Sequence, residues 1–278
     1  EYVRKQVLKA ARIWLVPWNE MVGAIAKLIQ HGDENKRWIG LELLAKRGGP
    51  SDAKLARPAL RDRDHEVRIM ALDTIRKLVP DGCRPDLLKR LTDKNRDVRQ
   101  RALEHLTECG RPEDVEQIVK RLADEDCFVR RDALKAAVTL APERKDELAL
   151  RMLGDDYKDV CEAAIAILRK GRDDLEIAEL AMKALPKARG DSGAVLMSLI
   201  KKAQPERLWI AVHDALRSKS WTARQWAASE VAKHMTAEDA TEHLERLTRD
   251  RAGSVRSEAF TQLLNIGGQD RDDLFGRM

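Results

Sequence analysis

The sequence has few aromatic residues and no long apolar run. Phenylalanine, tryptophan and tyrosine make up 4% of its 278 residues, whereas charged residues make up 36%. No stretch approaches the roughly 20 apolar residues that a membrane-spanning helix requires, and the N-terminus has no signal-peptide core. These absences argue against a membrane partner and favour a helical protein with a core of Leu, Ile, Val and Ala. We expect a cytoplasmic protein.

Cysteines are few and widely spaced. Cys83, Cys109, Cys127 and Cys161 form no Cys-x-x-Cys pair. This spacing argues against a disulfide framework or a zinc knuckle and fits a reducing compartment.

Motifs for catalysis are also missing. The segment 48–54 lacks the Lys-Ser/Thr of a phosphate-binding loop, no His-Glu-x-x-His occurs, and no serine lies in a nucleophile elbow. The sequence therefore predicts no catalytic residue, no metal site and no cofactor.

One phrase recurs in the middle of the chain, as DHEVRIMAL, NRDVRQRAL, DCFVRRDAL and YKDVCEAAI. Its valines, which we call marker valines, follow one another at intervals of 31 residues and are Val67, Val98, Val129 and Val160. A fixed period long enough for two short helices is typical of a solenoid, in which each unit contacts only its neighbours.

Each unit contains a shorter first helix and a second helix that carries the marker valine. The position three residues before the marker holds a residue that favours the N-cap of a helix, because its side-chain oxygen accepts a free backbone N–H. These residues are Asp33, Asp64, Asn95, Asp126 and Ser220. Glycine or proline closes most helices.

These features resemble the HEAT-repeat family, in particular its short bilin-lyase-type form with repeats of about 31 residues. The resemblance implies an Asp in each turn and an Arg six residues later, which form a ladder of hydrogen bonds between adjacent repeats. The ladder residues are Asp62, Arg68, Asp93, Arg99, Asp124, Arg130, Asp250 and Arg256. The ladder is expected to set the orientation of the repeats, because charge-assisted hydrogen bonds are directional.

The predicted fold is all-α: a single right-handed α-solenoid (superhelix) of about seven or eight HEAT-like helical hairpins over residues 1–278. Second helices are expected near 1–15, 33–47, 64–78, 95–108, 126–140, 156–169, 190–203, 220–233 and 252–266. A chain that opens on Glu1 and closes on what resembles the start of a helix is compatible with a segment of a longer protein.

The region 155–205 is expected to be irregular. Cys161 replaces the ladder arginine beside Asp155, and the next unit has neither ladder member. Its marker, Val195, comes 35 residues after Val160. Drift of a tolerant repeat and a hinge in the solenoid are the two interpretations.

In the family, second helices line a concave wall, so their exposed residues are candidates for partner binding. The candidates are Trp38, Ile69, Met70, Arg96, Arg101, Phe128, Arg131, Lys135 and Trp226. Mixed charge with isolated aromatic, Met and Arg side chains is typical of a protein-recognition surface. The alternatives are packing between repeats for the two tryptophans, and a solvated face with paired charges for the arginines.

Positive charge is concentrated at the N-terminus. Residues 1–60 contain eleven Lys/Arg and six Asp/Glu, and the rest of the chain is balanced. A basic patch of Arg4, Lys5, Lys9 and Arg12 is a candidate for contact with an acidic protein segment or a nucleic-acid backbone.

Two catalytic branches of the family offer weak matches. The di-iron deoxyhypusine hydroxylases use several His-Glu pairs, and this chain has one, His65-Glu66. The alkylbase DNA glycosylases place tryptophan beside a carboxylate, as do Trp38 with Glu42 and Trp209 with Asp214 in part. The preferred hypothesis is a non-enzymatic scaffold that binds a protein partner of unknown identity. The alternative is a nucleic-acid-binding HEAT protein, possibly such a glycosylase.

Overall fold

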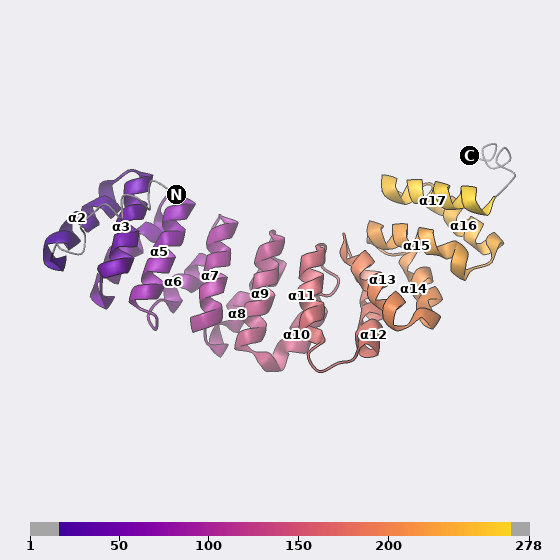
Figure 1. Ribbon diagram of the computed structural model, residues 1–278, viewed down its shortest axis with the longest axis horizontal. Coiled ribbons are helices and arrows are strands. Elements are labelled where there is room, and N and C mark those ends of the chain that lie inside the picture. Colours follow the sequence, from indigo (N-terminus) through magenta and orange to yellow (C-terminus); the bar gives the residue numbers. More distant parts are fainter. Residues whose placement is uncertain (1–16, 268–278) are drawn as a thin grey trace. The chain divides into compact units, whose positions relative to one another are not determined.

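The computed structural model describes residues 17–267, which form helices and turns without a β-strand (Figure 1). The chain divides into two compact units, unit 1 with residues 1–141 and unit 2 with residues 142–278. In each unit, shorter first helices alternate with longer second helices, which is the arrangement of an α-solenoid.

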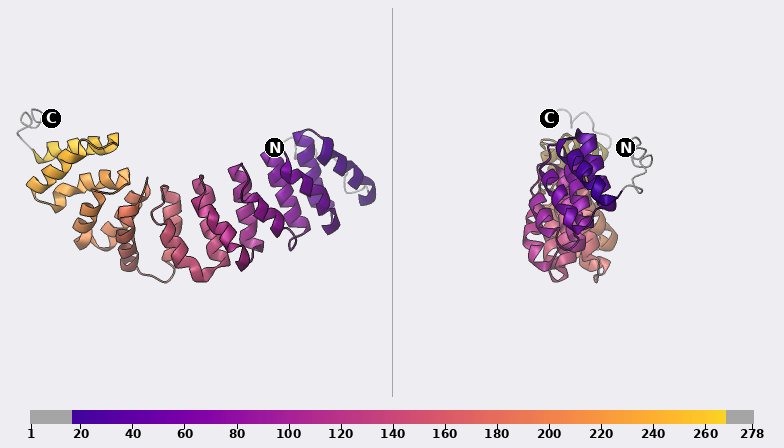
Figure 2. Two further views of the ribbon diagram at one scale, coloured as in Figure 1. Left: turned by 180° about the vertical axis from the view of Figure 1, so that it is seen from behind. Right: turned by 90° about the vertical axis from the view of Figure 1, so that its left-hand side faces the viewer.

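Unit 1 contains four described helix pairs. Its second helices are α3 (Glu34–Arg47), α5 (His65–Leu78), α7 (Arg96–Cys109) and α9 (Cys127–Leu140). Its first helices are α2 (Trp18–His31), α4 (Ala53–Ala56), α6 (Arg84–Arg90) and α8 (Val115–Val119), with short 3₁₀ turns around α4 and α8. Each second helix contacts the next, so they form one row, which Figure 2 shows from behind.

Unit 2 has the same alternation. Its first helices are α10 (Lys145–Met152), α12 (Asp174–Ala184), α14 (Leu208–Ala215) and α16 (Ala237–Leu247). Its second helices are α11 (Lys158–Leu168), α13 (Ser192–Ala203), α15 (Trp221–His234) and α17 (Gly253–Ile266). α11 contacts α13, α13 contacts α15, and α15 contacts α17.

Local sequence starts the second helices. The side chains of all five expected N-cap residues accept backbone N–H groups of the first helical turn; that of Asp126, for example, accepts from Phe128 and Val129. Each cap stabilises its helix by about 1 kcal/mol. The predicted caps are therefore confirmed.

The core repeats with the sequence. The marker valines are fully buried, and so is the alanine four residues after each of them: Ala71, Ala102, Ala133 and Ala164. This alanine lies on the same face of the helix as the marker valine, because residues four apart share a face. Its small side chain lets the neighbouring helix approach closely.

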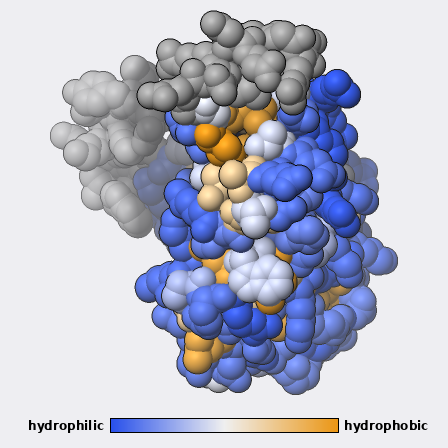
Figure 3. All heavy atoms as spheres, turned by 90° about the vertical axis from the view of Figure 1, so that its right-hand side faces the viewer, coloured by the Kyte–Doolittle hydropathy of each residue, from blue (hydrophilic) through white to orange (hydrophobic). Residues whose placement is uncertain are grey.

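The residue five positions after the marker is buried by the following second helix. Leu72, Leu103 and Leu134 at this position are 0% exposed. In α17, the last described helix, the equivalent residue Phe260 is 37% exposed. Apolar atoms gather among hydrophilic ones on this side of unit 2 (Figure 3). This position is thus partly exposed in α17, which no further second helix follows among the described residues.

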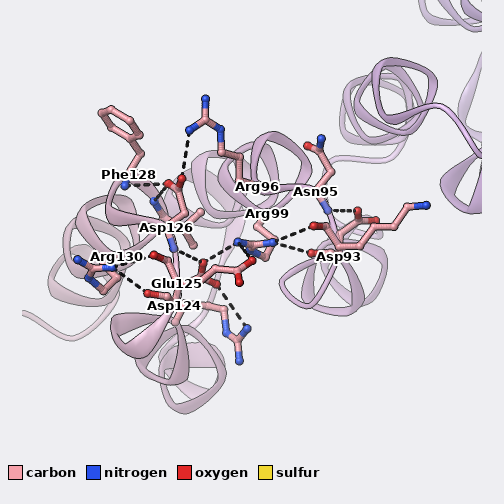
Figure 4. Close-up of polar contacts among 12 residues, drawn as sticks. Asp93, Asn95, Arg96, Arg99, Asp124, Glu125, Asp126, Phe128 and Arg130 are labelled. Carbon is pink, nitrogen blue, oxygen red and sulfur yellow. Dashed lines mark hydrogen bonds and ion pairs between the residues drawn. The ribbon is translucent and has the colours of Figure 1, made fainter.

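An Asp–Arg ladder joins the turns of unit 1, and its register differs from the six-residue pairing in the sequence. Arg99 donates to the backbone carbonyl of Asp93, six residues earlier, at 2.9 Å, and to the carboxylate of Asp124, 25 residues later, at 2.6 Å (Figure 4). Arg68 bridges Asp62 and Asp93 in the same way. Each of these arginines thus binds the aspartate carboxylate of the next repeat, whereas the aspartate six residues earlier contributes its backbone carbonyl.

The ladder fixes the charge of its aspartates. Burial opposes the charged form of Asp93, but hydrogen bonds from Arg68 and the Asn95 amide, together with the charges of Arg68 and Arg90, lower the pKa of its carboxyl. Arg68 and Arg99 are buried. Two buried opposite charges with several hydrogen bonds each specify one orientation of adjacent turns.

In unit 2, a different contact replaces the ladder between α11 and α15. Ala188 ends its first helix with the backbone angles of Asp62 and Asp124 but has no carboxylate. Two additional residues follow before the marker, and Gly190 adopts a positive φ of 46°. The Asp191 amide donates to the carbonyl of Asp156 at 3.0 Å.

The next turn of unit 2 joins to the same glycine. The hydroxyls of Ser220 and Thr222 donate to the carbonyl of Gly190, each at 2.6 Å. One turn later the ladder resumes, because Arg224 binds both carboxylate oxygens of Asp250, at 2.7 and 2.9 Å. Arg256 donates only to the backbone carbonyls of Asp250 and Arg251 among the described residues. The hinge expected within 155–205 stays a prediction.

Candidate functional site

The second helices of unit 1 enclose a groove of about 540 Å³ between α5, α7 and α9. We call it the second-helix groove. The residues that line it occupy one face of each helix, because they follow one another at intervals of three or four positions. Those from α5 and α9 are Ile69, Asp132 and Lys135, and those from α7 are Asp97, Gln100, Arg101, Glu104, Thr107 and Glu108.

Negative charge is in excess in this groove, because four carboxylates and two cations line it. Arg101 binds Glu104 at 3.0 Å and approaches Asp73 at 3.5 Å. The side-chain ammonium of Lys135 makes no hydrogen bond or ion pair within residues 17–267, whereas its backbone carbonyl accepts from the Thr139 hydroxyl. Each of the four carboxylates also has an arginine nearby, since Arg76 binds Glu108, Arg96 approaches Asp97 and Arg131 binds Asp132. They keep acceptor positions, because each can accept about four hydrogen bonds.

A histidine–aspartate pair lies beside the groove. The Nε2 atom of His105 is 2.7 Å from a carboxylate oxygen of Asp73, whereas its Nδ1 is buried without a partner in the described part of the chain. Asp73 therefore holds the imidazole between α5 and α7. Such a pair orients a ring, but acyl transfer would also require a nucleophile in contact with it.

Phe128 forms an aromatic anchor at the start of α9. The residue is 36% exposed, and two guanidinium groups lie near its ring, that of Arg96 at 5.8 Å and that of Arg131 at 5.3 Å from the centroid. Arg96 is held by Asp126, which is the N-cap of α9 (Figure 4). The hydrogen bond to Asp126 raises the pKa of Arg96, so this cation stays charged. Cation–π contacts at exposed sites are worth about 0.5–1 kcal/mol each.

The other sequence candidates occupy separate positions. Trp38 on α3 and Met70 on α5 are half-buried, and so is Trp226, which lies on α15 of unit 2. Arg4, Lys5, Lys9 and Arg12 of the basic patch lie outside the described residues.

The residues suggested by the catalytic branches do not form a metal cluster. His65 and Glu66 are 3.5 Å apart, and no group of three or more His, Cys, Asp or Glu within 17–267 is placed to hold a metal ion. Glu42, the carboxylate near Trp38, binds Lys46 at 2.8 Å.

The groove extends further along α7 than the sequence candidates suggest. Thr107 and Glu108 lie nine and ten positions after Val98, one helical turn beyond the last position assigned to the wall. Extending the same helical face by three or four residues would have identified them. None of the helices described between 17 and 267 combines the length and apolar character required to cross a membrane.

The chain matches no curated protein sequence. Among solved structures, it is similar to YibA of Escherichia coli, with 18% identity, 91% of this chain and 94% of that chain covered, and a TM-score of 0.47. It is also similar to the complex of CpcE and CpcF of phycocyanin lyase from Nostoc, with 15% identity, 81% and 92% coverage, and a TM-score of 0.44. An engineered protein shares 20% identity, with 88% and 68% coverage and a TM-score of 0.37.

A family model described as HEAT repeats matches residues 84–169. The match includes α7 and α9 with their ladder residues and the marker valines Val98, Val129 and Val160. The resemblance inferred from the valine, aspartate and arginine spacing is confirmed, and residues 84–169 are HEAT repeats.

Proposed function

We propose that the chain is a non-enzymatic scaffold that binds a protein partner in the second-helix groove of unit 1. The observation that carries this proposal is the groove itself, which three successive second helices line and which contains both charge and an apolar side chain. Protein interfaces combine a few apolar or aromatic anchors with polar groups that fix orientation.

The excess of carboxylates favours a partner segment with lysine or arginine. Asp97, Glu104, Glu108 and Asp132 offer acceptors along the groove, and Ile69 supplies an apolar contact. Phe128 with Arg96 and Arg131 provides a second anchor on the same helices. Complementary charge steers such a partner and fixes its register. The spacing of the cysteines supports a cytoplasmic location.

A peptide library displayed on phage tests this proposal. We expect selection against the full chain to enrich peptides with basic residues and one apolar residue. The double variant Glu104→Lys, Glu108→Lys should weaken these peptides at least tenfold, because two acceptors become repulsive. The matched double variant Glu143→Lys, Glu206→Lys changes the charge equally on exposed positions of unit 2 and should bind them as the wild type does.

Phe128→Ala together with Ile69→Ala tests the apolar contribution in the same assay. Removal of both anchors should weaken the enriched peptides about tenfold or more. Enrichment of acidic peptides, or equal binding by all variants, would contradict the assignment of this groove.

A further inference from the structure

Three successive turns of unit 2 carry basic residues on both sides of the ladder position. Ala188, Ser218 and Asp250 hold that position. The flanking residues, which we call the turn edge, are all exposed and are Lys187, Arg189, Arg217, Lys219, Arg249 and Arg251. Among the earlier turns, Ala123 and Glu125 flank Asp124, and Gly154 and Asp156 flank Asp155, whereas Arg61 and Arg63 flank Asp62 in unit 1. The turn edge is therefore a local concentration of positive charge.

These cations have almost no internal partners. Within residues 17–267, the one contact of their side chains is from Arg251 to the backbone carbonyl of Lys219, at 3.4 Å. Both carboxylate oxygens of Asp250 bind Arg224, and among the turn-edge cations Arg251 lies close enough for its charge to lower the pKa of Asp250. Asp156 and Asp191 are the nearby exposed carboxylates, so six cations face two anions.

Two aromatic rings lie among the cations. Tyr157 is 52% exposed and Trp221 is 40% exposed. Both line a cavity of about 640 Å³, and the charged residues of its lining are Arg189, Lys219, Arg251, Asp156 and Asp191. Two rings and three cations from four separate turns therefore meet in one hollow, which two carboxylates also line.

The floor of this hollow is held by the contacts that replace the ladder. An added Cβ on Gly190 would lie 2.1 Å from the carbonyl oxygen of Asp156, so only glycine fits this approach. The Gly190 carbonyl already accepts from Ser220 and Thr222. A ligand in the hollow would therefore meet rings and cations rather than free backbone groups.

We propose that the turn edge of unit 2 binds single-stranded nucleic acid. Its cations would contact phosphates, while Trp221 and Tyr157 would stack on bases, which is how proteins bind single strands without sequence preference. An acidic peptide would use the cations but not the rings, and a duplex keeps the faces of its bases stacked. This site differs from the second-helix groove in unit, charge and ligand.

The first test measures the binding of the full chain to a labelled oligothymidylate and a labelled oligouridylate of about 12 nucleotides. We expect both to bind at about 50 mM salt with a slope of log K against log salt near −4, since each of six phosphate contacts contributes about −0.7. The backbone carbonyls of the floor already accept hydrogen bonds, so we expect DNA and RNA to bind within a few-fold of each other.

Matched triple variants locate the site. Arg189→Gln, Lys219→Gln, Arg251→Gln should reduce the slope to about −2, because three contacts are lost. Lys77→Gln, Lys89→Gln, Lys120→Gln removes the same charge from exposed positions of unit 1 and should leave the slope unchanged. If substitution of Arg4, Lys5, Lys9 and Arg12 abolishes binding while the first triple variant does not, the site lies elsewhere and the proposal is overturned.

Substitutions of Trp221 test whether the ligand is a single strand or another polyanion. Trp221→Ala should weaken binding about tenfold, and Trp221→Phe should recover most of it, because stacking requires only an aromatic face. Circular dichroism of both variants shows whether they are folded. Failure of the wild type to bind at about 50 mM salt, or equal competition by polyglutamate or duplex DNA, would overturn the proposal.

Discussion

Adjacent turns are joined differently in the two units. In unit 1, the arginine of one repeat binds the aspartate of the next, as Arg68 does with Asp93 at 2.7 Å. In unit 2, between α11 and α15, backbone carbonyls of Asp156 and Gly190 accept from the following turn instead. The difference shows that a solenoid can keep its stacking without an ion pair, provided that every buried polar group has a partner.

The two candidate surfaces also differ in charge. The second-helix groove of unit 1 has an excess of carboxylates, whereas the turn edge of unit 2 has an excess of cations. The repeat allows this contrast because the buried core positions recur in both units, while the exposed residues beside them are free to vary.

The largest expected effect comes from breaking the ladder of unit 1. Arg99→Leu should destabilise α7 and α9 by about 3 kcal/mol, because it leaves the buried Asp124 carboxylate without its main counter-charge. Hydrogen exchange of the backbone amides measures this loss locally. Arg96 is exposed, and its partner Asp126 keeps two backbone hydrogen bonds without it, so Arg96→Leu should change stability by less than about 0.5–1 kcal/mol. Similar losses in both variants would contradict the importance of the buried rung.

Gly190 provides the corresponding test in unit 2. Gly190→Ala should destabilise α13 and α15 by about 2–3 kcal/mol, because a side chain at positive φ is strained and the new Cβ would overlap the Asp156 carbonyl. Hydrogen exchange in these helices measures the effect. Gly23→Ala is the control: it has nothing within 4 Å of the added Cβ and lies inside α2. It should stabilise that helix by about 0.5–1 kcal/mol. A change in stability of the same sign for Gly190→Ala and Gly23→Ala would be inconsistent with this account.

Ser220 sharpens the comparison, since it both caps α15 and joins it to the preceding turn. Ser220→Ala should cost about 1–2 kcal/mol, because the hydrogen bonds to the Ala223 amide and the Gly190 carbonyl are both lost. In unit 1, Asn95→Ala removes a cap whose side chain, among the described residues, accepts only from the amides of its own helix. Thermal unfolding of both variants measures the difference, and an equal or smaller loss for Ser220→Ala would argue against the joining role.

Acid should weaken the ladder gradually. The folded-state pKa values of Asp62 and Asp93 lie below the ordinary 3.8, because hydrogen bonds from Arg37 and Arg68 outweigh the opposing effect of burial. Their stabilisation is complete well above pH 3.8 and is lost as the pH falls below it toward the folded pKa values. Hydrogen exchange in α3, α5 and α7 between about pH 5 and 2 measures this loss. Unchanged protection over that range would exclude such a contribution.

Local features could be predicted from the sequence more fully than contacts between repeats. The caps at Asp64 and Asn95 were predictable, because an N-cap depends on amide groups two or three residues away. The side-chain partner of each ladder arginine was not evident from the pair six residues apart, since the true partner lies 25 residues ahead. Subtracting six from the period of 31 gives that separation.

The candidate sites divide in the same way. Ile69, Arg101 and Lys135 follow from the helical face that the marker valines define, and they line the groove. The hollow of unit 2 is lined by residues of four turns that are far apart in the sequence, and Gly190 with its positive φ is one of them. The pattern of cations around Ala188, Ser218 and Asp250 was visible in the sequence, but its concave shape was not.

By itself the sequence determined the period, the helix starts and the buried face, because each depends on residues within one or two helical turns. Only the tertiary structure decided which aspartate each arginine binds, where the second helices leave a groove, and how unit 2 joins its turns without a ladder. Those features depend on distances between repeats, and such distances follow from the packing of whole helices rather than from the order of residues in any one of them.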